Sequence, residues 1–219
     1  MHKTHLRLVL LAIIAVWLVL LTFMPSHHET EDAGPLPVLG SVSGFVLTNQ
    51  FGTPFDSRSL EGHVWVADVF FSRCPGPCVR LATNLKRLQD QLPAGNAVRL
   101  VSLTADAAYD QPPILERYAE RFGADTNRWS FLTGPQAAIY RAATEQLHLA
   151  VAENPDPESA KPSELFIHST KLVLVDQAGR VRGYFDGEDE EVVLNQLLPA
   201  ILRLEQELPD SPPGVPVAP

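Results

Sequence analysis

Residues 64–81 read VWVADVFFSRCPGPCVRL, and this stretch decides the fold. Residues 64–71 are nearly continuous in hydrophobicity and rich in β-branched and aromatic side chains, which is typical of a strand covered on both faces. Beyond the second proline, apolar residues recur at the spacing that gives a helix one buried stripe: Val79, Leu81, Leu85, Leu88 and Leu92. The stretch therefore predicts a buried strand, a loop with both cysteines of the chain, and a helix that begins near Cys78.

Strands and helices alternate on both sides of this unit. Before it the pattern predicts a short hairpin at 44–55. After it the pattern predicts a strand at 97–103, a helix at 112–122, a strand with a turn at 129–134 and a helix at 135–148. A second hairpin at 164–185 and a final helix at 192–204, kinked at Pro199, complete the prediction. The segment 153–163, with three prolines, predicts an exposed excursion. This order indicates a three-layer α/β sandwich with a central mixed sheet, in which the cysteine loop lies at the carboxyl end of a central strand.

The composition fits one globular domain with appendages. The chain has 219 residues, of which 45% are hydrophobic and 20% charged, and its formal net charge is -9. An acidic body repels phosphate backbones, which argues against nucleic acid as a partner. Two cysteines are too few for a disulfide scaffold, whereas a single close pair is typical of a redox or a metal site.

The N-terminal region contains an apolar run. Residues 8–24 are apolar except for Thr22, a length just sufficient to span a bilayer, and the nearby basic residues Lys3 and Arg7 stand only before the run. Positive flanks stay in the cytoplasm, so the sequence predicts a single-pass anchor with the domain outside. A cleaved signal peptide is the alternative, but residues 23–26 lack a small-x-small cleavage site.

The N-terminus leaves no room for an organelle transit peptide, so we expect a bacterial inner-membrane protein that faces the periplasm. The expected organisation is a cytoplasmic N-terminus at 1–7, a transmembrane anchor at 8–24, a linker at 25–36, the folded domain at 37–206 and a disordered proline-rich tail at 207–219.

Cys74 and Cys78 stand four residues apart at the start of a predicted helix. A disulfide that closes so short a ring stabilises a fold by only about 2 kcal/mol, against roughly 4.7 kcal/mol for a loop of a hundred residues, which disfavours a purely structural role. The helix dipole favours the thiolate, which is both the nucleophile of disulfide exchange and a metal ligand. Spacing alone leaves electron exchange and metal binding open. Taken alone, His168 is predicted to be a hydrogen-bonded structural residue.

Three segments together resemble the Sco/SenC family: FFSRCPGPC at 70–78, WSFLTG at 129–134 and HSTKLVLVDQAG at 168–179. The resemblance covers residues 37–206, and it rests on the combination, since Cys-x-x-x-Cys alone is a weak motif. It implies a thioredoxin-like fold in which Cys74, Cys78 and His168 bind copper for delivery to the dinuclear copper centre of cytochrome c oxidase. Two thiolates and an imidazole suit Cu(I) and also accept Cu(II).

The chain departs from the family pattern around the implied ligands. Val79 stands where a proline is usual after the second cysteine, and Ile167 stands where an aspartate often precedes the histidine. The acidic segment after the second central strand is only partly matched, by Asp106 and Asp110. Either carboxylate could substitute as a group that orients a ligand, but we expect both to be exposed loop carboxylates. These departures leave the three ligands intact and concern the residues that orient them.

The resemblance implies a membrane-tethered copper chaperone rather than an enzyme. Its expected partners are the copper-receiving subunit of cytochrome c oxidase and other periplasmic copper or thiol-redox proteins. The alternatives are a thiol-disulfide oxidoreductase that uses Cys74 and Cys78 on partner cysteines, and a copper or redox sensor. A disulfide exchanger usually has Cys-x-x-Cys and a proline before the strand that faces the cysteines, so the wider spacing and the lack of a proline beside His168 favour metal.

Overall fold

The computed structural model describes residues 34–93, 97–156, 158–161 and 164–207. The apolar run at 8–24 and the tail beyond Glu207 lie outside these residues, so the predicted anchor and the predicted disorder stay predictions. Within the described ranges, no helix is long and apolar enough to cross a membrane.

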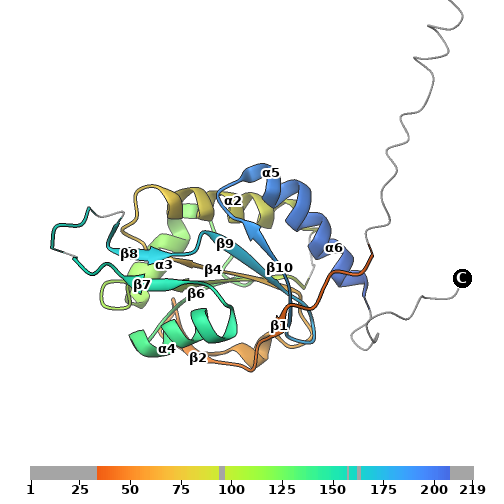
Figure 1. The fold of residues 1–219 in the computed structure, drawn as a ribbon, viewed down its shortest axis with the longest axis horizontal. Helices are drawn as coiled ribbons and strands as arrows, with labels where there is room; N and C mark the ends of the chain where they lie inside the picture. Colours follow the sequence, from red (N-terminus) through yellow and green to blue (C-terminus); the bar gives the residue numbers. More distant parts are fainter. Residues whose placement is uncertain (1–33, 94–96, 157, 162–163, 208–219) are drawn as a thin grey trace, which may run out of the picture. The chain divides into compact units, whose positions relative to one another are not determined.

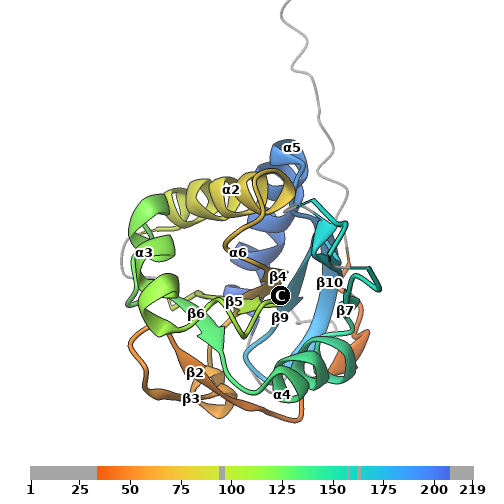
Figure 2. The ribbon, with the colours of Figure 1, turned by 90° about the vertical axis from the view of Figure 1, so that its left-hand side faces the viewer.

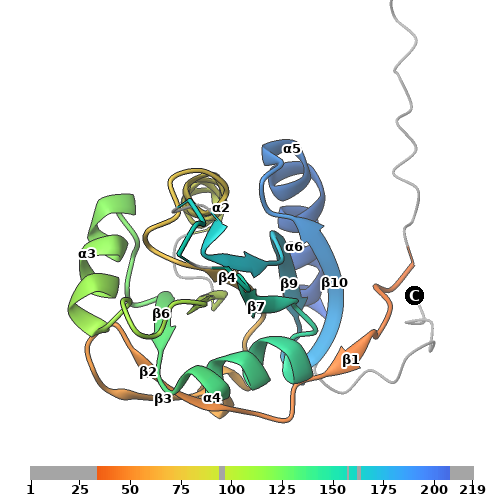
Figure 3. The ribbon, with the colours of Figure 1, turned by 60° about the vertical axis from the view of Figure 1, so that its left-hand side comes forward.

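The described part of the chain forms an eight-stranded mixed sheet in the order β1-β10-β9-β4-β5-β6-β2-β3. The central strands β4, β5 and β6 run parallel to one another, and β9 is antiparallel to β4. The sheet curls, as Figure 3 shows. Its strands are β1 (Gly40–Ser41), β2 (Val46–Asn49), β3 (Pro54–Asp56), β4 (Trp65–Phe70), β5 (Arg99–Thr104), β6 (Trp129–Thr133), β9 (Lys171–Val175) and β10 (Arg180–Asp186).

Helices cover both faces of this sheet (Figures 1 and 2). The crossovers from β4 through α2 to β5, and from β5 through α3 to β6, step in the same direction along the sheet, so right-handed connections put α2 and α3 on one face. α6 lies on that face too, and α4 lies on the other. The helices are α2 (Pro77–Gln91), α3 (Pro112–Phe122), α4 (Gln136–Arg141), α5 (Glu190–Val192) and α6 (Leu198–Gln206), with a 3₁₀ turn at Ser57–Leu60 and π-helical segments at Ala142–Gln146 and Val193–Leu197.

The predicted mixed α/β sheet is confirmed, and so are the buried strand at β4, the helix at α2 and the hairpin of β9 and β10. β4 is buried along its whole length, in agreement with its continuous hydrophobicity. The final helix contains a π-helical segment that ends at Leu197, two residues before Pro199, and the predicted kink itself stays a prediction. Because proline has no N–H, the helical ladder is disturbed there.

One segment of the predicted second hairpin is wrong. Phe166–His168 does not continue β9 but forms β8, which pairs with β7 (Val151–Glu153) in a separate two-stranded sheet that opposes Val151 to His168. The chain leaves the extended path because the Ser169 backbone N–H donates to the Ala150 carbonyl and the Ser169 hydroxyl accepts from the Lys171 backbone N–H. The predicted excursion from residue 153 therefore begins inside a strand.

Candidate metal centre

The cysteine loop connects the carboxyl end of β4 to α2. The backbone N–H of Cys74 donates to the Phe71 carbonyl over 3.1 Å, and the N–H groups of Val79 and Arg80 donate to the Gly76 carbonyl. α2 begins at Pro77, whose ring pre-sets the helical φ where an N–H would have no partner. This arrangement puts Cys78 in the first turn of α2 and leaves Cys74 on the loop.

The structure brings His168 to the cysteines. Nε2 of His168 lies 3.4 Å from Sγ of Cys78, although the two residues are far apart in sequence. Both cysteines are free thiols; Cys74 is 3% exposed and Cys78 is completely buried, while His168 is half-buried on β8. The pairing of β8 with β7, which sequence analysis did not predict, places the histidine there.

The hydrogen bonds of His168 set the tautomer of its ring. Nδ1 lies 3.0 Å from the Ser169 carbonyl, and a carbonyl oxygen only accepts, so Nδ1 carries the proton. Nε2 therefore keeps its lone pair toward Cys78, where it can accept a thiol proton or bind a metal. The imidazole edge also packs against the ring of Phe71, with centroids 5.6 Å apart.

The two thiols differ in acidity. A hydrogen bond from Cys78 to the Cys74 sulfur, helped by the backbone N–H groups of Cys78 and Gly76, lowers the pKa of Cys74 to about 5 against the cost of burial. The same hydrogen bond, together with burial, raises the pKa of Cys78 above its ordinary value. The pair therefore loses its first proton easily, from Cys74, and the remaining proton stays between Cys78 and its neighbours.

The donor set fits copper. Within the described residues no three Cys, His, Asp or Glu side chains stand in a closed metal-binding arrangement, and what the structure shows is a chain of contacts from Cys74 to Cys78 to His168. Two sulfurs and an imidazole nitrogen suit copper, whereas Mg²⁺ and Ca²⁺ prefer oxygen ligands. The residues of the predicted site are therefore neighbours, and their role as ligands remains a prediction.

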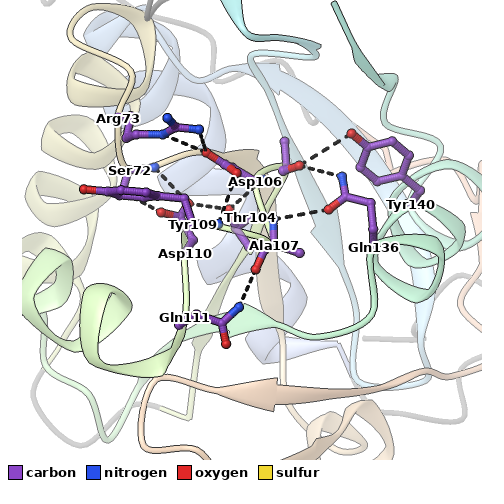
Figure 4. Close-up of polar contacts among 11 residues, drawn as sticks. Ser72, Arg73, Thr104, Asp106, Ala107, Tyr109, Asp110, Gln111, Gln136 and Tyr140 are labelled. Atoms are coloured by element: carbon purple, nitrogen blue, oxygen red, sulfur yellow. Dashed lines mark hydrogen bonds and ion pairs between the residues drawn. The ribbon is translucent and has the colours of Figure 1, made fainter. Parts of the chain in front are cut away.

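Asp106 and Asp110 were predicted to be exposed, and that prediction is wrong. Both are buried and hold the cysteine loop from the β5–α3 connection (Figure 4). Asp110 accepts from the backbone N–H of Ser72 over 3.0 Å, from the Ser72 hydroxyl and from the Thr104 hydroxyl. Asp106 accepts from the guanidinium of Arg73 over 2.9 Å. The carboxyl ends of the parallel strands β4 and β5 meet at one edge, a topological signal that could have predicted these contacts.

The connection after β5 is also fixed from the opposite face of the sheet. The side chain of Gln136, at the start of α4, donates to the Ala105 carbonyl over 2.7 Å and accepts from the backbone N–H of Ala107 over 3.2 Å (Figure 4). The Gln111 side chain donates to the Ala107 carbonyl. The backbone groups of Ala105 and Ala107 therefore have hydrogen-bond partners, which fix the connection that in turn holds the cysteine loop.

Sequence analysis missed Asp68, a buried carboxyl in the middle of β4. Desolvation raises its pKa to about 7, opposed by the hydroxyl of Ser102, which donates to it. Nε1 of Trp129 donates in turn to the Ser102 oxygen over 2.9 Å. One charge in an otherwise apolar strand was the signal available in the sequence.

Comparisons with known proteins identify the family of the chain. The SCO1/SenC family model matches residues 39–202. A "SCO1 protein homolog" of Bacillus subtilis is 31% identical over 153 residues, which cover 69% of this chain and 76% of that protein.

Solved structures show the same fold. BsSco, described as a member of the Sco family of cytochrome c oxidase assembly proteins with a disulfide switch, is 26% identical with a TM-score of 0.63, over 76% of this chain and 98% of that one. Bradyrhizobium japonicum ScoI, solved with copper bound, is similar in fold at 20% identity and a TM-score of 0.57, over 77% and 99% of the two chains. With a family model that spans most of the domain, a close pair of thiols and a histidine against them, the chain belongs to the SCO1/SenC family.

Proposed function

We propose that this chain is a membrane-anchored copper metallochaperone that delivers copper to the dinuclear copper centre of cytochrome c oxidase. The observation that carries the proposal is the 3.4 Å approach of His168 Nε2 to Cys78 Sγ, with the lone pair of Nε2 turned to the sulfur. An imidazole nitrogen placed beside two thiols completes a set of soft and borderline donors that suits Cu(I). BsSco belongs to a family of cytochrome c oxidase assembly proteins, and Bradyrhizobium japonicum ScoI was solved with copper bound, which supports the same assignment.

Copper is cargo in this proposal. Cys74, Cys78 and His168 hold it as Cu(I), for which two thiolates and an imidazole are well suited, and they also accept Cu(II). The low pKa of Cys74 means that its sulfur is deprotonated at neutral pH before metal arrives. His168 is the least buried of the three, so a receiving protein approaches from its side. The apolar run at 8–24 and the basic residues before it support an anchor in a bacterial inner membrane with the domain in the periplasm.

A second candidate function is thiol-disulfide exchange on partner cysteines. The difference in acidity between the cysteines favours it, because a low-pKa thiolate attacks and a second thiol resolves the mixed disulfide. The nucleophilic cysteine of an oxidoreductase is usually partly exposed to solvent, whereas Cys74 is only 3% exposed. This burial favours copper transfer as the principal activity.

A transfer experiment separates the two functions. The full-length protein loaded with one Cu(I) is mixed with the apo, fully reduced copper-receiving domain of cytochrome c oxidase, and the copper content of each protein is measured after separation. We expect copper to move to the receiving domain. If copper stays behind while the same protein reduces an oxidised receiving domain with turnover, the oxidoreductase function is the correct one.

A further inference from the structure

A hollow of about 290 Å³ lies beside the cysteine loop. The cysteine loop, the β5–α3 connection and α3 all contribute to its walls, with Ser72, Arg73, Tyr109, Arg117, Tyr118 and Arg121. We call this hollow the arginine groove. It lies next to the candidate metal centre, because Arg73 directly precedes Cys74 and the Tyr118 hydroxyl donates to the Cys78 carbonyl over 3.4 Å.

The side of α3 that lines the groove is cationic. Ile114, Arg117, Tyr118 and Arg121 recur at i, i+3, i+4 and i+7, which places them on one stripe of the helix. The acidic residues of α3, Glu116 and Glu120, lie off this stripe and do not line the groove, although Glu120 is three residues from Arg117 and so neighbours it on the helix surface. The groove is therefore lined by three arginines and by no acidic side chain.

Two of the three guanidinium groups are available to a ligand. Arg73 is engaged by the buried carboxylate of Asp106 and stacks 4.5 Å above the ring of Tyr109. Arg117 and Arg121 are exposed, and among the described residues neither forms an ion pair; Arg121 lies over the ring of Phe122. Like charges gathered around one hollow repel one another, and an anionic ligand removes that cost.

The groove has the composition of a protein-binding surface. Arginine and tyrosine are the residues enriched at the energetic centres of interfaces, and Tyr109 is 46% exposed beside them. The rest of the chain is acidic, with a formal net charge of -9, so a local cationic groove selects a partner region of opposite sign. The overall negative charge disfavours a long phosphate backbone, which would extend beyond the groove over acidic surface, whereas a short acidic segment of a protein need contact only the groove.

We propose that the arginine groove docks an acidic segment of the protein that exchanges copper with Cys74, Cys78 and His168. The proposal rests on the proposed function for the identity of that protein, the copper-receiving domain of cytochrome c oxidase. Carboxylates of the partner pair with Arg117 and Arg121, and this docking holds the partner's own ligands beside the cysteine loop. Charge complementarity of this kind acts mainly on the association rate.

Charge reversal tests the proposal. The variant Arg117→Glu/Arg121→Glu and a control, Arg141→Glu, are compared as full-length proteins; Arg141 is exposed at the end of α4, on the other face of the sheet. The second-order rate of copper transfer to the receiving domain is measured at low and at high ionic strength, together with the Cu(I) affinity of each donor. We expect the double variant to transfer about tenfold more slowly or worse at low ionic strength, the control to stay within about twofold, and the gap to shrink at high salt.

The outcomes are distinguishable. An unchanged Cu(I) affinity with a slower transfer supports docking at the groove. Equal rates for the double variant and Arg141→Glu overturn it. Slowing that persists at high salt also overturns the proposal, because the cause is then structural. The variant Arg117→Gln/Arg121→Gln, which removes the charges without reversing them, should show a smaller slowing that also disappears at high salt. Two further measurements identify a free-anion site. In the first, inorganic phosphate at constant ionic strength removes the difference in transfer rate between the wild type and the double variant. In the second, a receiving domain with its acidic residues neutralised accepts copper at the unaltered rate. Both results together would overturn docking of an acidic protein segment. If the wild type binds no copper, the proposed function fails first.

Discussion

Asp68 is the one charged side chain buried inside β4, and its carboxyl has a pKa of about 7 because burial disfavours the ionised form. The unfolded pKa of an aspartate is about 3.9. When the folded pKa is higher than this, the carboxyl lowers the free energy of unfolding at every pH above about 3.9, because the unfolded state ionises more readily. Stability is therefore lost as pH rises from about 4 to about 7 and stays lower above that. The charge of Asp68 also contributes, after the hydrogen bond to Cys74 and burial, to the raised pKa of Cys78.

Asp68→Asn should remove this dependence. At pH 8 the variant should be more stable than the wild type by about 2–4 kcal/mol, because one pKa unit corresponds to about 1.4 kcal/mol, and near pH 4 the two should be equal. Urea unfolding at both pH values measures the difference. Glu116→Gln, the same exchange at an exposed position of α3, should change little at either pH. A benefit of Asp68→Asn that does not vary with pH would contradict this explanation.

At the scale of elements, the cysteine loop is held by the connection after β5 as well as by its own backbone hydrogen bonds. Asp110 alone accepts three hydrogen bonds, two from Ser72 and one from Thr104. The loop between β4 and α2 therefore has a fixed conformation before any metal binds, which lowers the cost of assembling the site.

Asp110→Ala should leave three donors without an acceptor. Each buried donor that loses its partner costs about 1–3 kcal/mol, and removal of the unfavourable desolvation of the Asp110 carboxyl offsets part of that cost. We therefore expect the variant to be destabilised by about 2–4 kcal/mol in chemical denaturation and to bind Cu(I) more weakly. Gln111→Ala, which removes the neighbouring exposed side chain, is the control and should cost less than about 1 kcal/mol. Full stability of Asp110→Ala would show that the loop is held by other contacts.

The elements that the sequence predicts are those whose signal is local. The continuous apolar run of β4 and the helical stripe of α2 lie next to each other in the chain, so the strand, the loop and the helix could be predicted together. The pairing of β8 with β7 joins segments on either side of a proline-rich excursion, and no periodicity within Phe166–His168 distinguishes that pairing from a continued β9 strand. The burial of Asp106 and Asp110 likewise depends on the meeting of two strand ends in space.

The candidate site divides in the same way. Cys74 and Cys78 could be found from their spacing, whereas His168 entered only through the family resemblance, because an isolated histidine in an apolar strand has no local signature of a ligand. Asp68 could have been noticed as a charge in a buried strand. Its raised pKa and its contact with Ser102 require the alignment of β4 with β5.

At the scale of the whole molecule, one buried ion-pair cluster joins the first and last parts of the described domain. Asp176, in the β9–β10 turn, accepts from Arg180 and Arg182, and Arg182 also donates to the Leu36 carbonyl and to Glu207 after α6. Burial works against the ionised form of Asp176, but the hydrogen bonds from the Arg180 backbone and from the two guanidinium groups outweigh it, and its pKa is lowered.

Asp176→Asn should destabilise the domain in a pH-dependent way. Its folded pKa lies below the unfolded value, so the carboxylate stabilises the fold above about pH 4, and this contribution is lost as pH falls through the folded pKa. Since the substitution leaves buried Arg182 short of a partner, we expect a loss of about 3–5 kcal/mol at pH 7. Thermal or urea unfolding from pH 7 to pH 3 measures it; a gap that does not narrow toward acid would contradict the assignment.

The most direct test of the copper site is a competitive Cu(I) titration of the full-length wild type against Cys74→Ala, Cys78→Ala and His168→Ala, with His63→Ala, at the other end of β4, as the control. We predict one Cu(I) per wild-type chain, an affinity lower by at least tenfold in each of the three variants, and wild-type affinity in the control. Equal affinity in the wild type and His168→Ala would contradict the three-ligand site, and a wild type that binds no copper would contradict the account as a whole.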